Sequence, residues 1–149
     1  MKIAIGTDHG AIDYKSEMIK HLTDKGFDVD DCGTNSTESC DYPDFAKIVA
    51  EKVASGDADF GILMCGTGIG MSLAANKVKG IRAAVVPNVD YAKLSKQHNN
   101  ANIICLSGRF MSLDDCKACV DAYMNEEFAG DRHERRVNKI MEIENEYFK

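Results

Sequence analysis

The stretch DFGILMCGTGIGMSLAA, residues 59–75, is the part of the sequence that decides the fold. Its first part, Phe60 to Met64, is a short apolar run, as expected for a strand buried on both faces of a parallel sheet. Three glycines then alternate with other residues, and Met71 to Ala75 consists of good helix formers. The stretch therefore predicts a strand, a glycine loop and a helix in direct succession.

Cys65 ends the predicted strand, and Gly66, Gly68 and Gly70 follow it. Free backbone N–H groups and the dipole at a helix N-terminus favour an anion. The same field lowers the pKa of a nearby thiol. The pattern indicates an anion cradle beside a nucleophile or base. The alternative is a tight turn whose glycines only allow close packing, and the loop by itself leaves both open.

The loop does not match three familiar phosphate-binding patterns. No Lys-Ser/Thr pair follows the last glycine, as a nucleoside-triphosphate loop requires. The dinucleotide fingerprint needs a glycine, and a phosphotyrosine-phosphatase loop an arginine, at the position where Met71 stands. The loop is therefore not a nucleoside-triphosphate loop, and it fits the other two patterns poorly.

Apolar periodicity divides the rest of the chain into alternating strands and helices. The predicted strands cover residues 3–6, 27–31, 60–64, 81–86 and 103–106. The predicted helices cover residues 11–25, 43–55, 71–75, 90–97 and 113–123, and a last amphipathic helix carries Val137, Ile140, Met141 and Ile143. Such alternation calls for a parallel sheet covered on both faces, in one α/β domain over residues 1–149. We expect the strand at 27–31 to lie near a sheet edge, because apolar and acidic residues alternate there.

Ligands of parallel sheets bind beyond the carboxyl ends of the strands. This rule is expected to bring several polar residues together on one rim, because each follows a predicted strand. They are Asp8, His9, Cys65, Thr67 and Arg109.

Composition and charge exclude several classes of protein. The 149 residues are 44% hydrophobic and 28% charged, as in a soluble globular domain with a proper core. No apolar run is long enough to span a membrane, and the N-terminus becomes polar too early for a signal peptide, so we expect a cytoplasmic protein. The net charge of −6 argues against nonspecific nucleic-acid binding.

One basic cluster stands out in the acidic C-terminal part of the chain. Arg132 and Arg136 are four residues apart and project from one helical face, with Arg135 near its edge. A solvated charged face is the ordinary explanation of such a run. Guanidinium groups also match the geometry of phosphate oxygens, so the cluster is a candidate phosphate clamp.

Five of the six cysteines are interpreted as reduced structural thiols, and Cys65 is the exception. Cys116 and Cys119 have CxxC spacing, but they fall inside a predicted helix, where core packing is favoured over redox or zinc chemistry. No group of residues has metal-ligand spacing, so no metal is predicted.

Six segments together carry a resemblance to a known family. They are TDHGA (7–11), DYPD (41–44), CGTGIGMSLAANK (65–77), GIRAA (80–84), QHNNAN (97–102) and DRHERR (131–136). This combination resembles the type B ribose-5-phosphate isomerases, whose wider group includes galactose-6-phosphate isomerase subunits. The resemblance implies a Rossmann-like three-layer sandwich with an extra C-terminal helix, no cofactor, a small sugar phosphate as substrate, and a homodimer with active sites at the subunit interface.

The resemblance also implies roles for individual residues. Cys65 is similar to the base that moves a proton between C1 and C2 of the open-chain sugar. Thr67 and His98 resemble the groups that assist ring opening, with Asp8 close by. The loop Gly66–Gly70, including Gly68, would hold the enediolate oxygens.

The same resemblance assigns the substrate contacts farther from the reacting carbons. The family's phosphate ligands match His9, Arg109, Arg132 and Arg136, and its sugar-hydroxyl contact matches Asn99. His133 lies near the site in the family pattern without an assigned role.

Together these expectations describe a metal-independent isomerase of the pentose phosphate pathway that interconverts ribose 5-phosphate and ribulose 5-phosphate. A six-carbon substrate, allose or galactose 6-phosphate, is an alternative, because the sequence does not show the depth of the pocket. A non-catalytic sugar-phosphate sensor is a second alternative. Such a sensor would need the cradle but neither Cys65 nor His98.

Overall fold

The chain folds around a five-stranded parallel sheet, which confirms the predicted α/β class. The computed structural model describes residues 1–148. Its strands are β1 (Lys2–Thr7), β2 (Asp28–Asp31), β3 (Phe60–Cys65), β4 (Ala83–Val85) and β5 (Ile103–Ser107). Their spatial order is β2-β1-β3-β5-β4, with every pair parallel. β2 is therefore an edge strand, as its alternating sequence predicts.

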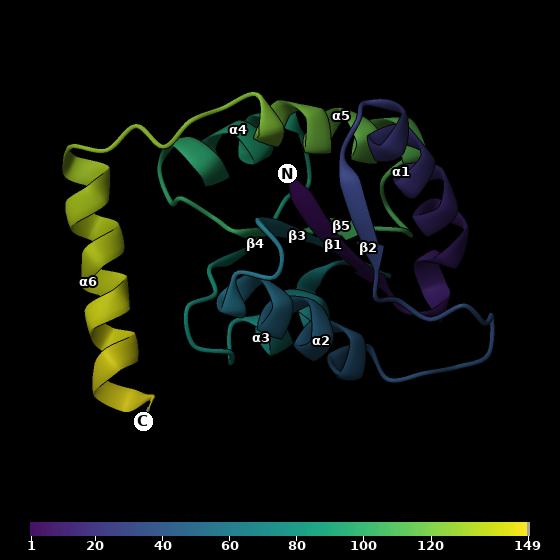
Figure 1. The fold of residues 1–149 in the computed structure, drawn as a ribbon, viewed down its shortest axis with the longest axis horizontal. Coiled ribbons are helices and arrows are strands. Elements are labelled where there is room, and N and C mark those ends of the chain that lie inside the picture. The colour runs from purple at the N-terminus through teal and green to yellow at the C-terminus, as the bar shows by residue number, and fades with distance from the viewer. Residues whose placement is uncertain (149) are drawn as a thin grey trace.

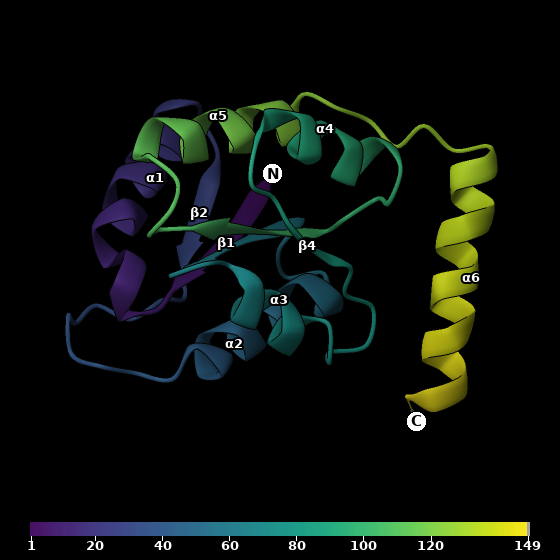
Figure 2. The same cartoon turned by 180° about the vertical axis from the view of Figure 1, so that it is seen from behind.

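Helices cover both faces of the sheet and complete three layers (Figure 1). One face carries α1 (Ile12–Asp24), α4 (Val89–Gln97) and α5 (Leu113–Met124), and a short 3₁₀ helix, η1 (His9–Ala11), precedes α1. The other face carries α2 (Tyr42–Ser55) and α3 (Ile69–Ala75). The grouping is also visible from behind (Figure 2).

The apolar run of β3 is explained by its place in the middle of the sheet. Ile62 and Met64 pack into the core beneath α1, α4 and α5, whereas Leu63 and Cys65 pack into the core against α2 and α3. Successive side chains of a strand point to opposite faces, so a strand covered on both sides needs apolar residues at every position.

The last helix, α6 (Arg132–Tyr147), lies outside the three layers, beyond the β4 edge of the sheet (Figures 1 and 2). Val137 is its only buried residue among those that the structure describes. Within residues 1–148, no helix combines the length and the apolar character that crossing a bilayer requires.

β4 is shorter than the strand predicted over residues 81–86. The amide side chain of Asn76 occupies both backbone groups of Ala83: its Oδ1 accepts from the Ala83 N–H at 2.8 Å, and its Nδ2 donates to the Ala83 carbonyl at 3.0 Å. The Ile81 N–H meanwhile donates to the Val78 carbonyl in a turn. The turn at Ile81 accounts for the later start of the strand, and β4 contains only three residues.

Candidate active site

The glycine loop turns the chain from β3 into α3 through one position that requires glycine. Gly68 has φ +82°, and a Cβ atom there would lie 3.1 Å from the Leu106 carbonyl oxygen. Glycine satisfies both constraints, because it adopts a positive φ without strain and has no Cβ atom. The turn leaves Cys65, which is 5% exposed, at the carboxyl end of β3.

Hydrogen bonds fix the backbone on both sides of Cys65. The Gly68 N–H donates to Cys65 Sγ at 3.2 Å. On the β5 side, the Gly66 carbonyl accepts from Ser107 Oγ at 2.6 Å and from the Arg109 N–H at 3.1 Å. The thiol is therefore held between the loop and the end of β5.

A cavity of about 470 Å³ opens above this loop. Its lining comes from the ends of β1, β3 and β5 and from α2 and α3: Asp8, Tyr42, Cys65, Gly66, Thr67, Ile69, Gly70, Leu73 and Arg109. The structure thus brings together four of the five residues predicted to share this rim. One of them, Asp8, is anchored because its Oδ1 accepts from the Gly10 N–H at 2.9 Å.

Tyr42 belongs to this cavity and received no role from the sequence, although it stands in the DYPD segment. A Cβ atom added to Gly70 would lie 2.6 Å from atoms of the Tyr42 ring, so the ring rests directly on the loop. The motif drew attention to the segment, but it did not show that the segment folds back over the loop.

His9 lies in η1 and contacts a different part of the chain from the four residues in the cavity. Its Nδ1 accepts from the Cys40 N–H at 3.1 Å. A neutral imidazole that accepts at one nitrogen carries its proton on the other, so Nε2 is the donor nitrogen of His9. The loop that contains Cys40 therefore selects the tautomer of His9.

The remaining predicted residues form a second group. His98 and Asn99, at the end of α4, line a separate cavity of about 340 Å³. Arg132 and Arg136 are exposed on α6. The ring of His133 stacks on that of His98 with centroids 4.1 Å apart. In the single chain this second group does not line the cavity of Cys65.

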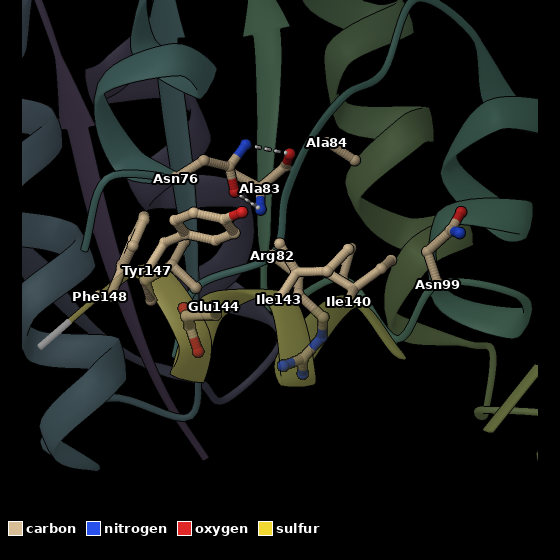
Figure 3. Close-up of a pocket in the computed structure, with 12 residues that line it drawn as sticks. Asn76, Arg82, Ala83, Ala84, Asn99, Ile140, Ile143, Glu144, Tyr147 and Phe148 are labelled. Carbon is tan, nitrogen blue, oxygen red and sulfur yellow. Dashed lines mark hydrogen bonds between the residues drawn. The ribbon is translucent and has the colours of Figure 1, made fainter. Parts of the chain in front are cut away.

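A larger cavity, about 600 Å³, lies between α6 and the β4 edge (Figure 3). Ile140 and Ile143 of α6 point into it, opposite Arg82 and Ala83. Of the residues predicted for the site, only Asn99 lines it within the described chain. Its lining is more strongly apolar than that of the cavity above Cys65, which includes Asp8, Thr67 and Arg109.

All six cysteines are free, which agrees with the prediction that they are reduced. Cys116 and Cys119 are completely buried in α5. Burial is the main cause that raises the pKa of Cys116 to about 12 and that of Cys119 to about 11, so both remain protonated at neutral pH. Core packing, rather than redox chemistry, explains their CxxC spacing.

Comparisons with known proteins agree along nearly the whole chain. Residues 3–140 match the model of the family described as Ribose/Galactose Isomerase. The chain is 46% identical to ribose-5-phosphate isomerase B of Escherichia coli strain K12, covering 96% of each protein. It is 40% identical to galactose-6-phosphate isomerase subunit LacB of Clostridium acetobutylicum, covering 98% of this chain and 86% of that protein.

Solved structures show the same similarity. Ribose-5-phosphate isomerase B of Clostridium thermocellum superposes with a TM-score of 0.97 at 52% identity, covering 99% of both chains. The Mycoplasma genitalium enzyme with bound ribulose-5-phosphate superposes with a TM-score of 0.94 at 46% identity, covering 97% of both chains. This chain therefore belongs to the ribose/galactose isomerase family.

Proposed function

We propose that this chain, acting as one sugar-phosphate isomerase domain, interconverts ribose 5-phosphate and ribulose 5-phosphate in the pentose phosphate pathway. The observation that carries the proposal is the buried Cys65 in a cavity with Asp8, Thr67 and Arg109, in a chain 46% identical to a ribose-5-phosphate isomerase B. The reaction proceeds by ring opening and then by proton transfer through a cis-enediolate.

Cys65 is the base in this mechanism and moves the proton between C1 and C2 of the open-chain sugar. The hydrogen bond from the Gly68 N–H to Sγ supports this role, because such a donor stabilises a thiolate better than a thiol. Backbone N–H groups of Gly66–Gly70 hold the developing enediolate oxygens. Preorganised donors aimed at developing charge are a large source of rate enhancement.

The other residues open the ring and position the sugar. Thr67 and His98 move protons as the furanose opens, with Asp8 close by, and Asn99 contacts a sugar hydroxyl. The phosphate is bound by His9, Arg109, Arg132 and Arg136. Anchoring the phosphate away from C1 and C2 converts binding energy into correct orientation at the reacting carbons.

A homodimer with shared active sites accounts for the two separate groups of residues. Cys65 and His98 must act on the same sugar, yet they line different cavities of one chain. Leu73 beside the Cys65 cavity is 64% exposed, and Ile143 on α6 is 59% exposed. Such apolar side chains at both groups suit burial against a second copy.

Mixed dimers test the shared site. Cys65→Ala and His98→Ala proteins are each nearly inactive under this proposal. After co-refolding, a mixed dimer regains one intact site, because Cys65 of one copy meets His98 of the other. Random pairing then restores about a quarter of wild-type activity, since half of the dimers are mixed and each has one working site. No recovery, with refolded wild type as control, would place the site within one chain.

A substrate comparison tests the reaction itself. Purified protein is assayed with ribose 5-phosphate, allose 6-phosphate and galactose 6-phosphate, and the proposal expects the highest kcat/KM for the pentose. The likeness to a galactose-6-phosphate isomerase subunit makes a hexose phosphate the second candidate. Binding of all three sugars without any turnover would instead indicate a sensor.

A further inference from the structure

Two histidines from separate helices lie flat against each other beside the predicted phosphate clamp. His98 is the C-cap of α4, and His133 is in the first turn of α6. Their ring centroids are 4.1 Å apart and their planes differ by 9°. Both side chains are half-buried. Contact between flat rings at this distance restricts how either ring can rotate.

The start of α6 is tied to the end of α4 through the residue before His98. The Ala129 N–H donates to the Gln97 carbonyl at 3.0 Å, and Gln97 Nε2 donates to Glu126 Oε2 at 2.7 Å. Asp131 then adopts φ +50° and ψ −125°, a conformation that few residues other than glycine adopt. Strained backbone persists where its surroundings determine it, so the entry into α6 is a fixed connection.

The His98 ring makes no hydrogen bond or ion pair within the described residues. Its backbone N–H donates to the Leu94 carbonyl at 2.9 Å, which holds the main chain. Neither ring nitrogen makes a hydrogen bond to residues 1–148, so both remain available to a substrate. The stack on His133 is therefore the one directional interaction of the His98 ring within the described residues.

Burial and the neighbouring positive charges disfavour the protonated form of the His133 ring. Burial is the largest cause that lowers its pKa below the ordinary 6.5, followed by His98, Arg132 and Arg136, while Asp131 opposes the shift. These causes favour the neutral form of the ring that stacks on His98.

We propose that His133 is a positioning residue that holds the His98 imidazole in the plane required for opening the furanose ring. The inference rests on the proposed function, in which His98 moves a proton during that step. His133 acts through His98, and its position on α6 connects the ring-opening residue to the helix that carries the phosphate arginines.

Two substitutions separate stacking from other roles. His133→Phe keeps a flat ring against His98, whereas His133→Ala removes it. Two reactions are measured for each variant. Conversion of ribose 5-phosphate requires ring opening. Exchange of solvent deuterium into C1 of ribulose 5-phosphate needs only the enediolate step, because ribulose 5-phosphate is open-chain.

His133→Ala is expected to slow the conversion of ribose 5-phosphate roughly tenfold to a hundredfold. The loss is only part of the rate enhancement that a proton-transfer group usually gives, because His98 itself is still present. Deuterium exchange should change by less than about threefold, because proton transfer at C1 does not use His98. His133→Phe should stay within about threefold of wild type in both reactions. Equal losses in the two reactions, or equal losses in the two variants, would overturn the proposal.

The failure of this inference is distinguishable from the failure of the proposed function. A wild-type protein that neither converts ribose 5-phosphate nor exchanges C1 of ribulose 5-phosphate would contradict the function itself. A wild type active in both reactions, with a His133→Ala variant that loses neither selectively, would contradict only the role of His133.

Discussion

The glycine loop and helix α6 hold their functional groups in opposite ways. Cys65 lies 5% exposed at the end of a central strand, where backbone hydrogen bonds fix the loop around it. Arg132 and Arg136 are exposed on a helix with one buried residue among those described. Proton transfer needs fixed geometry away from water, whereas phosphate binding needs charge and reach. Under the proposed function, the loop would supply the first and α6 the second.

The largest expected effect comes from removing the thiol. Cys65→Ala should reduce turnover by about a thousandfold or more, because no other base replaces it. The dissociation constant of ribulose 5-phosphate should change little, since the proposed phosphate-binding arginines of α6 are unchanged. Steady-state kinetics and calorimetric binding measure the two quantities. Cys119→Ala, a buried cysteine of α5, is the control and should keep its turnover. Substantial activity in Cys65→Ala would remove Cys65 as the base.

Removing an arginine from α6 should weaken substrate binding more than it slows turnover. Arg132→Ala is expected to raise KM for ribose 5-phosphate roughly tenfold to a hundredfold, as loss of a charge-assisted contact does, with a smaller change in kcat. The melting temperature should hardly move because the side chain is exposed. Arg135→Ala, on the same helix, is the matched control. An unchanged KM in Arg132→Ala would exclude it from the site.

Two neighbouring glycines can sharpen the contrast within the loop. Gly68→Ala should lower the free energy of unfolding by about 1–3 kcal/mol, because a side chain at positive φ is strained and contacts the Leu106 carbonyl. At Gly66→Ala, the added Cβ atom would lie 3.5 Å from the Arg109 guanidinium, which is ordinary van der Waals contact. We therefore expect a smaller loss of stability in this variant. Urea denaturation compares the two variants. Equal stabilities would mean that the loop does not depend on the Gly68 conformation.

The smallest expected effect comes from an ion pair between α2 and β2, outside both the glycine loop and α6. Lys52 Nζ donates to Asp30 Oδ2, and this hydrogen bond is the main cause that lowers the pKa of the Asp30 carboxyl. A lowered carboxyl pKa contributes stability above its ordinary value, and that contribution disappears as pH falls through the folded-state pKa. Lys52→Met should therefore lower the melting temperature slightly at pH 7 and not in strong acid, with kinetics unchanged. A shift that persists in acid would show that lost packing is responsible.

The sequence predicted what depends on neighbouring residues along the chain. The buried run of β3, the edge position of β2 and the rim of strand ends all follow from local patterns. The N-cap of α5 is also of this kind: Ser112 is a preferred capping residue, and its hydroxyl accepts from the Asp115 N–H at 3.0 Å. These features are set by alternation, capping and the carboxyl-end rule, which a sequence displays directly.

What the sequence left open depends on contacts between distant segments. The Tyr42 ring on the loop, the Cys40 N–H that selects the His9 tautomer and the stack of His98 with His133 all join separate elements. The division of the site into two groups is of the same kind. The local sequence pattern of α6 predicts a helix, but it does not predict where that helix packs relative to the sheet.

The amide of Asn76 has a consequence for how these molecules behave when crowded. An edge strand with free N–H and C=O groups is a template on which another chain can add and begin a fibre. Asn76 occupies both backbone groups of Ala83 in a three-residue strand, which leaves a very short ladder for an incoming strand. The Asn76 side chain thus hinders another chain from pairing with the β4 edge, which borders an apolar cavity.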